Sequence, residues 1–284
     1  MKRNHPMSIK IVTDSTCDLP DEIIKALDIT VIPLYIHFND DSYLDKVDIT
    51  REEFYEALET AEKCPTTAVP GIDTFKRTYQ TLADQGAKEI LSIHISTALS
   101  ATLNVAQKAA ETAPIPVTVM DSGQLSMGVG LLVKRAAEMA EEGVSMSEIL
   151  RTLEEDGKRT YVFAALDTLK YLQKSGRMNP FIAGIGSLLH VRPVMKMNQG
   201  NPSSELIRTR KKALQRVLDH VKELAPIQEI ALVHTNAPQE AEALWEDIKT
   251  FLSQKTPPFS VTVTPVIGTH IGPGAVGFAF RSEG

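Results

Sequence analysis

Strand-like and helix-like segments alternate through the first half of the chain. Residues 9–13 and 90–95 show the alternation of apolar and polar residues that is typical of β-strands, and strands are also predicted at residues 30–38 and 117–120. Helical segments follow them, including residues 50–59, 102–112 and 125–142. This order predicts an α/β/α domain with a mostly parallel sheet over residues 8–158.

Capping residues mark the helix starts in this half. Thr50 precedes Glu53 by three residues and Ser145 precedes Glu148 by three, which is the spacing of a capping box. We predict a further helix with Asp73 as its N-cap, just after a proline-rich segment.

The second half of the chain has a different pattern. Strands are predicted at residues 160–166, 191–197, 205–208, 229–234 and 260–265. Helices are predicted at residues 168–173, in a segment that starts at residue 179, in a segment that follows residues 208–212 and ends near residue 224, and around Trp245. The turn at residues 198–202 joins two strands directly, so these two strands are antiparallel. Residues 159–284 are therefore predicted to form an α+β domain with a mixed or antiparallel sheet.

Composition and charge exclude several classes of protein. The chain has 284 residues, enough for about two domains, and a formal net charge of −6 that argues against nucleic-acid binding. Its two cysteines, Cys17 and Cys64, lie far apart and lack the spacing of metal ligands. There is no apolar run long enough for a membrane span and no signal peptide, so a cytoplasmic location is expected.

Polar side chains follow several of the predicted strands. Asp14 and Ser15 end the first strand, where parallel sheets place ligands. Ser100 lies near the start of a helix, where unpaired N–H groups favour a carboxylate or a phosphate, and Ser96 lies one turn earlier. Thr67 lies in a segment stiffened by prolines at 65 and 70. Local turns and helix caps explain the same residues without a ligand.

A glycine-rich segment near the end of the chain contains one histidine. Residues 268–277 carry four glycines and Pro273 around His270. Glycine allows positive φ and close approach, and proline stiffens the backbone. We expect a loop that holds His270 at a defined place, with Gly268 and Gly272 as supporting residues. A hairpin-like turn with an incidental histidine is the alternative.

Two further segments point to binding rather than catalysis. The helix predicted from residue 179 contains Gly184 and Gly186, which disfavour a helix by about 1 kcal/mol each and so indicate close packing by another element or by an apolar ligand. A basic run covers residues 208–212.

No GxxxxGK[ST], GxGxxG, HExxH or GxSxG motif is present, and no paired carboxylates suggest acid–base catalysis. No cofactor and no metal site are expected.

Six motifs, in order, resemble those of DegV-family proteins. They span residues 9–280 and comprise Ile11-Val12-Thr13-Asp14-Ser15, Pro65-Thr66-Thr67, Leu99-Ser100-Ala101-Thr102, Ser175-Gly176-Arg177, Arg208-Thr209-Arg210-Lys211-Lys212 and Gly268-Thr269-His270-Ile271-Gly272-Pro273-Gly274. The resemblance implies a two-domain fold and a non-catalytic, fatty-acid-binding subunit of a fatty acid kinase. Such a subunit holds a fatty acid such as palmitate, stearate or oleate in a buried tunnel and presents its carboxylate to a separate ATP-using kinase, which forms the acyl phosphate for phospholipid synthesis.

The resemblance also implies roles for individual residues. Thr67, Ser100 and His270 would bind the carboxylate, with Asp14, Ser15, Ser96, Gly268 and Gly272 in support. The acyl tunnel would be lined by Phe181, Ile182, Gly184, Ile185, Gly186 and Leu189. Arg177 and Arg208 would dock on the kinase, and transient contact with a membrane is compatible with this function.

The chain departs from the family pattern at two places. Ala68 and Val69 replace two polar residues of the family's TSQP loop, and Ala101 replaces the glycine of its LSGT motif. The preference for a particular length of acyl chain therefore stays open. Two alternatives also stay open: a stand-alone hydrolase or phosphotransferase that uses Ser100 and His270, and a lipid carrier or sensor without a kinase partner.

Overall fold

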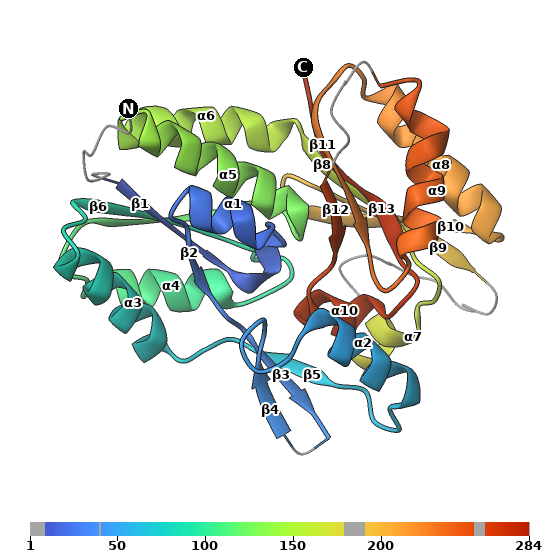
Figure 1. Ribbon diagram of the computed structural model, residues 1–284, viewed down its shortest axis with the longest axis horizontal. Coiled ribbons are helices and arrows are strands. Elements are labelled where there is room, and N and C mark those ends of the chain that lie inside the picture. Colours follow the sequence, from blue (N-terminus) through green and yellow to red (C-terminus); the bar gives the residue numbers. More distant parts are fainter. Residues whose placement is uncertain (1–8, 40, 179–190, 253–258, 284) are drawn as a thin grey trace.

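A computed structural model describes residues 9–39, 41–178, 191–252 and 259–283. The strands of these residues form three sheets, of four, six and three strands. In Figure 1 the four-stranded sheet lies on the left, the six-stranded sheet on the right and the small sheet below them. The predicted combination of a parallel sheet and a mixed sheet is confirmed.

The four-stranded sheet is parallel throughout. Its order is β2-β1-β6-β7, with β1 at Ile9–Asp14, β2 at Thr30–Ile32, β6 at Glu89–His94 and β7 at Val117–Asp121. Because successive side chains of a strand point to opposite faces, Ile11 and Val12 belong to different hydrophobic clusters.

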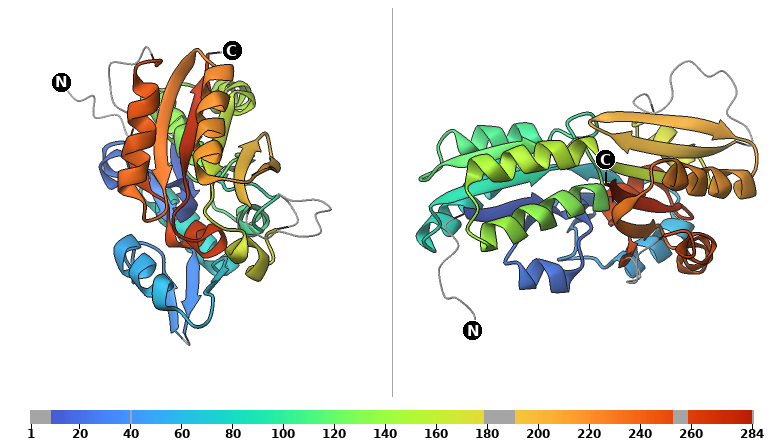
Figure 2. Two further views of the ribbon diagram at one scale, coloured as in Figure 1. Left: turned by 90° about the vertical axis from the view of Figure 1, so that its right-hand side faces the viewer. Right: turned by 90° about the horizontal axis from the view of Figure 1, so that it is seen from above.

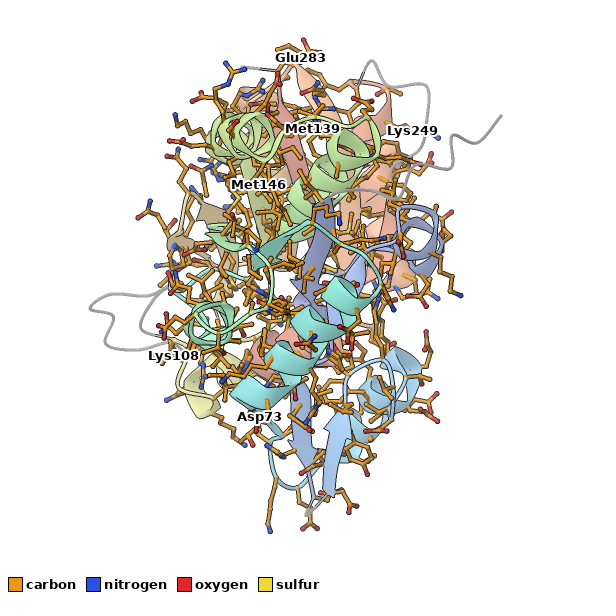
Figure 3. The ribbon with its side chains drawn as sticks, turned by 90° about the vertical axis from the view of Figure 1, so that its left-hand side faces the viewer. Asp73, Lys108, Met139, Met146, Lys249 and Glu283 are labelled. Carbon is orange, nitrogen blue, oxygen red and sulfur yellow. The ribbon has the colours of Figure 1, made fainter. Side chains whose placement is uncertain are left out.

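Helices cover both faces of the parallel sheet. Val12 packs with α3 (Ile72–Asp84) and α4 (Thr102–Ala110), and Ile11 packs with α5 (Met127–Glu141) and α6 (Met146–Lys158). Figure 3 shows α3 in front, with Asp73 at its lower end, and α5 and α6 above it, near Met139 and Met146. A 3-10 turn, η1 (Ser15–Cys17), and α1 (Asp21–Ala26) connect β1 to β2.

The six-stranded sheet is mixed. Its order is β10-β9-β8-β13-β11-β12, with β8 at Thr160–Ala165, β9 at Arg192–Asn198, β10 at Asn201–Ile207, β11 at Ile227–His234, β12 at Phe259–Thr262 and β13 at Val276–Ser282. The strands β11 and β12 are parallel, and the other neighbours are antiparallel, including the predicted β9–β10 hairpin.

The two large sheets share a hydrophobic cluster through α5. Phe278 and Phe280 pack with α8 (Arg210–Glu223) and α9 (Pro238–Lys249) on one face of the mixed sheet. Ala279 points to the opposite face and joins the cluster that contains α5 and Ile11. Figure 2 shows the two sheets end to end in the view from above. The predicted boundary after residue 158 falls between α6 and β8 and stays a prediction.

A small third sheet was not predicted. Its order is β4-β3-β5, with β3 at Tyr35–Phe38, β4 at Asp41–Leu44 and β5 at Thr66–Ala68, and it packs with α2 (Arg51–Thr60) and α10 (Pro265–Ile271). The prediction of a single strand at residues 30–38 was wrong, because β2 and β3 belong to different sheets. Pro33 lies between them and has no N–H to continue a ladder.

The predicted helix starts differ in their outcome. Thr50 forms the predicted capping box with Glu53, and Ser145 caps α6. The prediction for Asp73 was wrong: Gly71 is the N-cap of α3, without a side-chain hydrogen bond. The helix predicted from residue 179 lies outside the described residues. None of the helices that the structure describes has the length and apolar character needed to cross a bilayer.

Candidate functional site

A mostly apolar cavity lies where the carboxyl ends of β1 and β6 meet the small sheet, α7 (Lys170–Lys174) and α10. Its volume is about 140 Å³. Five of its lining side chains are polar, namely Thr16, Thr67, Ser100, Arg177 and His270. The others are Leu34, Ala68, Val69, Ile95, Leu99, Ala101, Leu125, Leu172, Met195, Val266, Ile267 and Ile271.

Two of the predicted carboxylate ligands are in direct contact. The Oγ1 atom of Thr67 lies 2.9 Å from Nε2 of His270, across 203 residues of sequence. Thr67 is held by β5, where it pairs with Ile36 of β3. His270 is held by the last turn of α10. The cavity therefore joins a strand of the first half of the chain to a helix of the second half.

His270 is neutral near pH 7. Burial, helped by the positive charge of Arg177, lowers the pKa of His270 to about 4. Its Nδ1 atom is buried and has no hydrogen-bond partner among the described residues. A histidine that acted as a general base would need a nucleophile on one ring nitrogen and an orienting group on the other. His270 contacts the Thr67 hydroxyl through Nε2, but no described carboxylate orients the ring through Nδ1.

Ser100 lines the cavity and Ser96 does not. The Oγ atom of Ser100 lies 2.8 Å from Oγ1 of Thr102 and accepts a 3.3 Å bond from the Thr102 N–H. Ser96 is buried, and its Oγ accepts a 3.3 Å bond from the Ala98 N–H. The N-cap of α4 is Ala101, so Ser100 lies one residue before the cap and its hydroxyl faces the cavity at a helix start.

Asp14 and Ser15 serve the fold around the cavity. The Asp14 carboxylate accepts bonds from the Thr16 N–H (3.0 Å) and hydroxyl, from the Ile95 N–H (3.2 Å) and from the His94 ring (2.9 Å). Burial alone would raise the pKa of Asp14, but these bonds outweigh burial and lower it. Ser15 accepts a 3.2 Å bond from the Leu34 N–H. Neither Asp14 nor Ser15 lines the cavity.

Residues 268–271 of the histidine segment are the end of a short helix, and only residues 272–275 form the predicted loop. The helix α10 runs through His270 to Ile271, and the positive φ of 74° at Gly272 ends it. A Cβ atom on Gly268 would lie 2.4 Å from the Tyr55 hydroxyl, and one on Gly272 would lie 2.2 Å from the Tyr171 ring. The two glycines therefore admit tyrosines from α2 and α7. They do not line the cavity.

The two predicted docking arginines lie in different settings. Arg177 is exposed, lines the cavity and donates a 3.0 Å bond to the Ser175 carbonyl. Arg208 is exposed between β10 and α8. Its neighbour Arg210 is structural, because it binds Glu240 and the carbonyl of Gly274 in the turn after α10.

Several lining residues were missed by the sequence reasoning. Thr16 and Leu34 follow β1 and β2, so the rule that ligands lie at the carboxyl ends of parallel strands could have found them. Leu125 and Met195 carry no such signal, because only tertiary packing brings them to the cavity. The predicted tunnel residues Phe181, Ile182, Gly184, Ile185, Gly186 and Leu189 lie outside the described residues. In the part of the chain that the structure describes, no cluster of His, Cys, Asp or Glu could hold a metal ion.

A family model described as "Uncharacterised protein, DegV family" matches residues 8–283. The chain belongs to the DegV family. A DegV domain-containing protein of Halalkalibacterium halodurans is 34% identical over 283 residues, which cover 97% of this chain and 99% of that protein. One from Clostridium acetobutylicum is 31% identical over 280 residues, with the same coverage of 97% and 99%.

Solved DegV structures have the same fold. A Bacillus subtilis structure, described as DegV, a fatty acid binding protein, is 30% identical, with a TM-score of 0.89 over 98% of this chain and 100% of that one. A Thermus thermophilus DegV family protein, described by its fatty acid binding, is 32% identical, with a TM-score of 0.89 over 96% and 99%. A stearic acid-binding protein of Eubacterium ventriosum is 26% identical, with a TM-score of 0.87 over 96% and 98%.

Proposed function

We propose that this DegV protein binds a long-chain fatty acid, with the carboxylate at Thr67, Ser100 and His270, and presents that carboxylate to a separate ATP-dependent kinase. The observation that carries the proposal is the contact between Thr67 and a neutral His270 in a mostly apolar cavity. The fatty acid binding described for the B. subtilis and T. thermophilus relatives supports the same class of ligand.

The hydrogen-bond directions at this contact suit an anion. A neutral imidazole has one N–H group. In this proposal Nε2 carries that proton and donates to Thr67 Oγ1. The Thr67 hydroxyl proton is then free to be donated to a carboxylate.

Apolar burial supplies the affinity in this proposal. Each buried CH₂ contributes about 0.8 kcal/mol, so a long acyl chain binds tightly with few polar contacts. The described cavity is close to the roughly 150 Å³ that accommodates benzene, so it has room for the head of a fatty acid. The rest of the tail is proposed to follow the predicted tunnel, whose residues lie outside the described part.

Arg177 gains a second role in this proposal. It was predicted to dock on the kinase, and it also lines the cavity. A cation at the mouth attracts the carboxylate and stays within reach of a partner. The kinase contact, the cytoplasmic location and the role in phospholipid synthesis remain part of the proposal.

A reconstituted reaction tests the proposal. Oleate is first titrated into the delipidated protein, and binding is expected. The complex is then mixed with ATP and a bacterial fatty acid kinase, and acyl phosphate is expected only when all components are present. Turnover by the chain alone would contradict the proposal in favour of a hydrolase or phosphotransferase. Binding without transfer would favour the carrier or sensor alternative.

A further inference from the structure

The start of α10 is bound to a buried polar cluster outside the cavity lining. We call it the Asp18 cluster, and its members are Asp18, Asp45, Arg51, Ser126 and Thr264. Asp18 is fully buried at the end of η1, with a positive φ of 56°. Its backbone conformation is uncommon for a residue other than glycine, so the surroundings define it closely.

Asp18 binds three separate segments of the chain. Its carboxylate accepts a 2.8 Å bond from the N–H of Thr264, the N-cap of α10. It accepts a 3.0 Å bond from Arg51 of α2 and a 2.6 Å bond from the hydroxyl of Ser126, the N-cap of α5. One carboxylate therefore fixes the relative positions of α2, α5 and α10.

Further bonds hold the segment that leads into α10. Arg51 also donates to the carbonyl of Thr262, and Tyr55, one turn later on α2, donates a 2.9 Å bond to the carbonyl of Val263. The Thr264 hydroxyl donates to Asp45. Three consecutive residues before α10 are thus bound by side chains from elsewhere in the chain.

Burying the Asp18 carboxylate costs free energy of folding. Burial raises the pKa of Asp18 to about 6, although the charge of Arg51 and the bond from Ser126 act in the opposite direction. A buried ion pair commonly stabilises a fold less than apolar side chains of similar volume. Placing a carboxylate here is therefore better explained by the geometry that it imposes than by the stability that it supplies.

That geometry extends to His270. His270 lies six positions after Thr264, a distance of about 9 Å along a helix. The His270–Thr67 contact of 2.9 Å is lost if α10 shifts by much more than 0.5 Å, because hydrogen bonds fail near 3.6 Å. We propose that Asp18 is a positioning residue of the lipid site: it fixes the start of α10 and so holds His270 against Thr67. This inference rests on the proposed function.

A double-mutant cycle of Asp18 and His270, with oleate affinity as the measured quantity, tests the coupling between these two residues. Asp18→Ala, which removes the acceptor of the Thr264 N–H, is expected to weaken binding about tenfold in the native background and less than about twofold when His270→Gln is already present. The control is Asp156→Ala. Asp156 is a buried carboxylate that binds Arg159 and Arg281 and does not line the cavity, so its variant is expected to lose stability with unchanged affinity.

A spectroscopic measurement tests the same inference without lipid. The ¹⁵N shifts of the His270 ring report its tautomer and its bond to Thr67. They are expected to change in Asp18→Ala and to stay unchanged in Asp156→Ala. If Asp18→Ala does not fold, Arg51→Gln replaces it, because that variant removes the bonds from Arg51 to Asp18 and to the Thr262 carbonyl just before α10.

The outcomes separate this inference from the proposed function. Failure of the native protein to bind oleate would refute the proposed function, while a changed His270 spectrum in Asp18→Ala would still support positioning. Native His270 signals in the Asp18 variant, or in the Arg51 variant that replaces it, would overturn the inference. So would an equal loss of affinity with and without His270.

Discussion

At the scale of single residues, the proposed site depends on the contact between Thr67 and His270. Burial lowers the pKa of His270 to about 4, so the proposal has His270 orient the Thr67 hydroxyl as a neutral partner. Arg177 supplies the positive charge near the cavity from an exposed position. An anion at this site meets hydrogen-bond donors and one cation, which favours retention over chemical change.

Removing the Thr67 hydroxyl is expected to weaken fatty acid binding. Hydrogen bonds to charged groups contribute about 1.5–3 kcal/mol, so Thr67→Val is expected to raise the Kd for oleate by roughly 10- to 100-fold. Thr66→Val is the matched control, because Thr66 is exposed on the same strand and does not line the cavity. Equal affinities of the two variants in calorimetric titration would refute the assigned role of Thr67.

The neutral state of His270 predicts a pH dependence of stability. Its folded pKa of about 4 lies below the ordinary value of 6.5, so the unfolded chain binds the proton more tightly. The contribution of His270 is fully present above pH 6.5 and is lost as the pH falls toward 4. Denaturant titrations of lipid-free protein are expected to show a smaller loss over this range in His270→Gln. Parallel curves for the two proteins would contradict the assigned pKa.

Helix α10 is the element that connects the site to the fold. It has seven residues, too few for a stable isolated helix, so its neighbours must hold it. Tyr55 packs against Gly268, Tyr171 packs against Gly272, and the Asp18 cluster binds its start. The position of His270 therefore depends on α2, α7 and η1 together.

A pair of glycine substitutions tests this packing. Gly268→Ala is expected to destabilise the protein by about 1–3 kcal/mol, because the added Cβ would lie 2.4 Å from the buried Tyr55 hydroxyl. Gly157→Ala in α6 meets nothing within 4 Å and is expected to stabilise by about 0.4–1 kcal/mol. Thermal unfolding measures the stability of both variants, and the two changes in stability must have opposite signs.

The same element shows what the sequence could and could not predict. The spacing of apolar residues predicted most strands and helices, and Ser100 was correctly expected near a helix start. A loop was predicted for residues 268–277 because of their glycines and Pro273, which is right for residues 272–275 and wrong for residues 268–271. Tertiary packing of two tyrosines holds the helical part despite Gly268. The strands β4 and β5 are too short to show a pattern, and β5 gains its partner from a distant part of the sequence.

The proposed ligand would link two parts of the chain at the scale of the whole molecule. Thr67 belongs to the small sheet and His270 to the segment that leads into β13, while α5 packs against both large sheets. A ligand that contacts both Thr67 and His270 binds only the folded arrangement. Its binding energy therefore adds to the stability of the entire molecule.

Oleate is accordingly expected to raise the unfolding temperature of the delipidated protein. At a free concentration 100 times the Kd, the added stability is about 2.7 kcal/mol. Thr67→Val is expected to show a smaller rise at the same oleate concentration, and Thr66→Val the native rise. Scanning calorimetry measures all three, and a rise that is equal in both variants would place oleate at another site.

Native mass spectrometry of the protein as purified tests the central claim most directly. The account predicts an excess mass equal to one long-chain fatty acid, such as palmitate, stearate or oleate, that is lost on denaturation and can be identified in the extract. A protein that carries no lipid, and stays empty after incubation with these fatty acids, would contradict it.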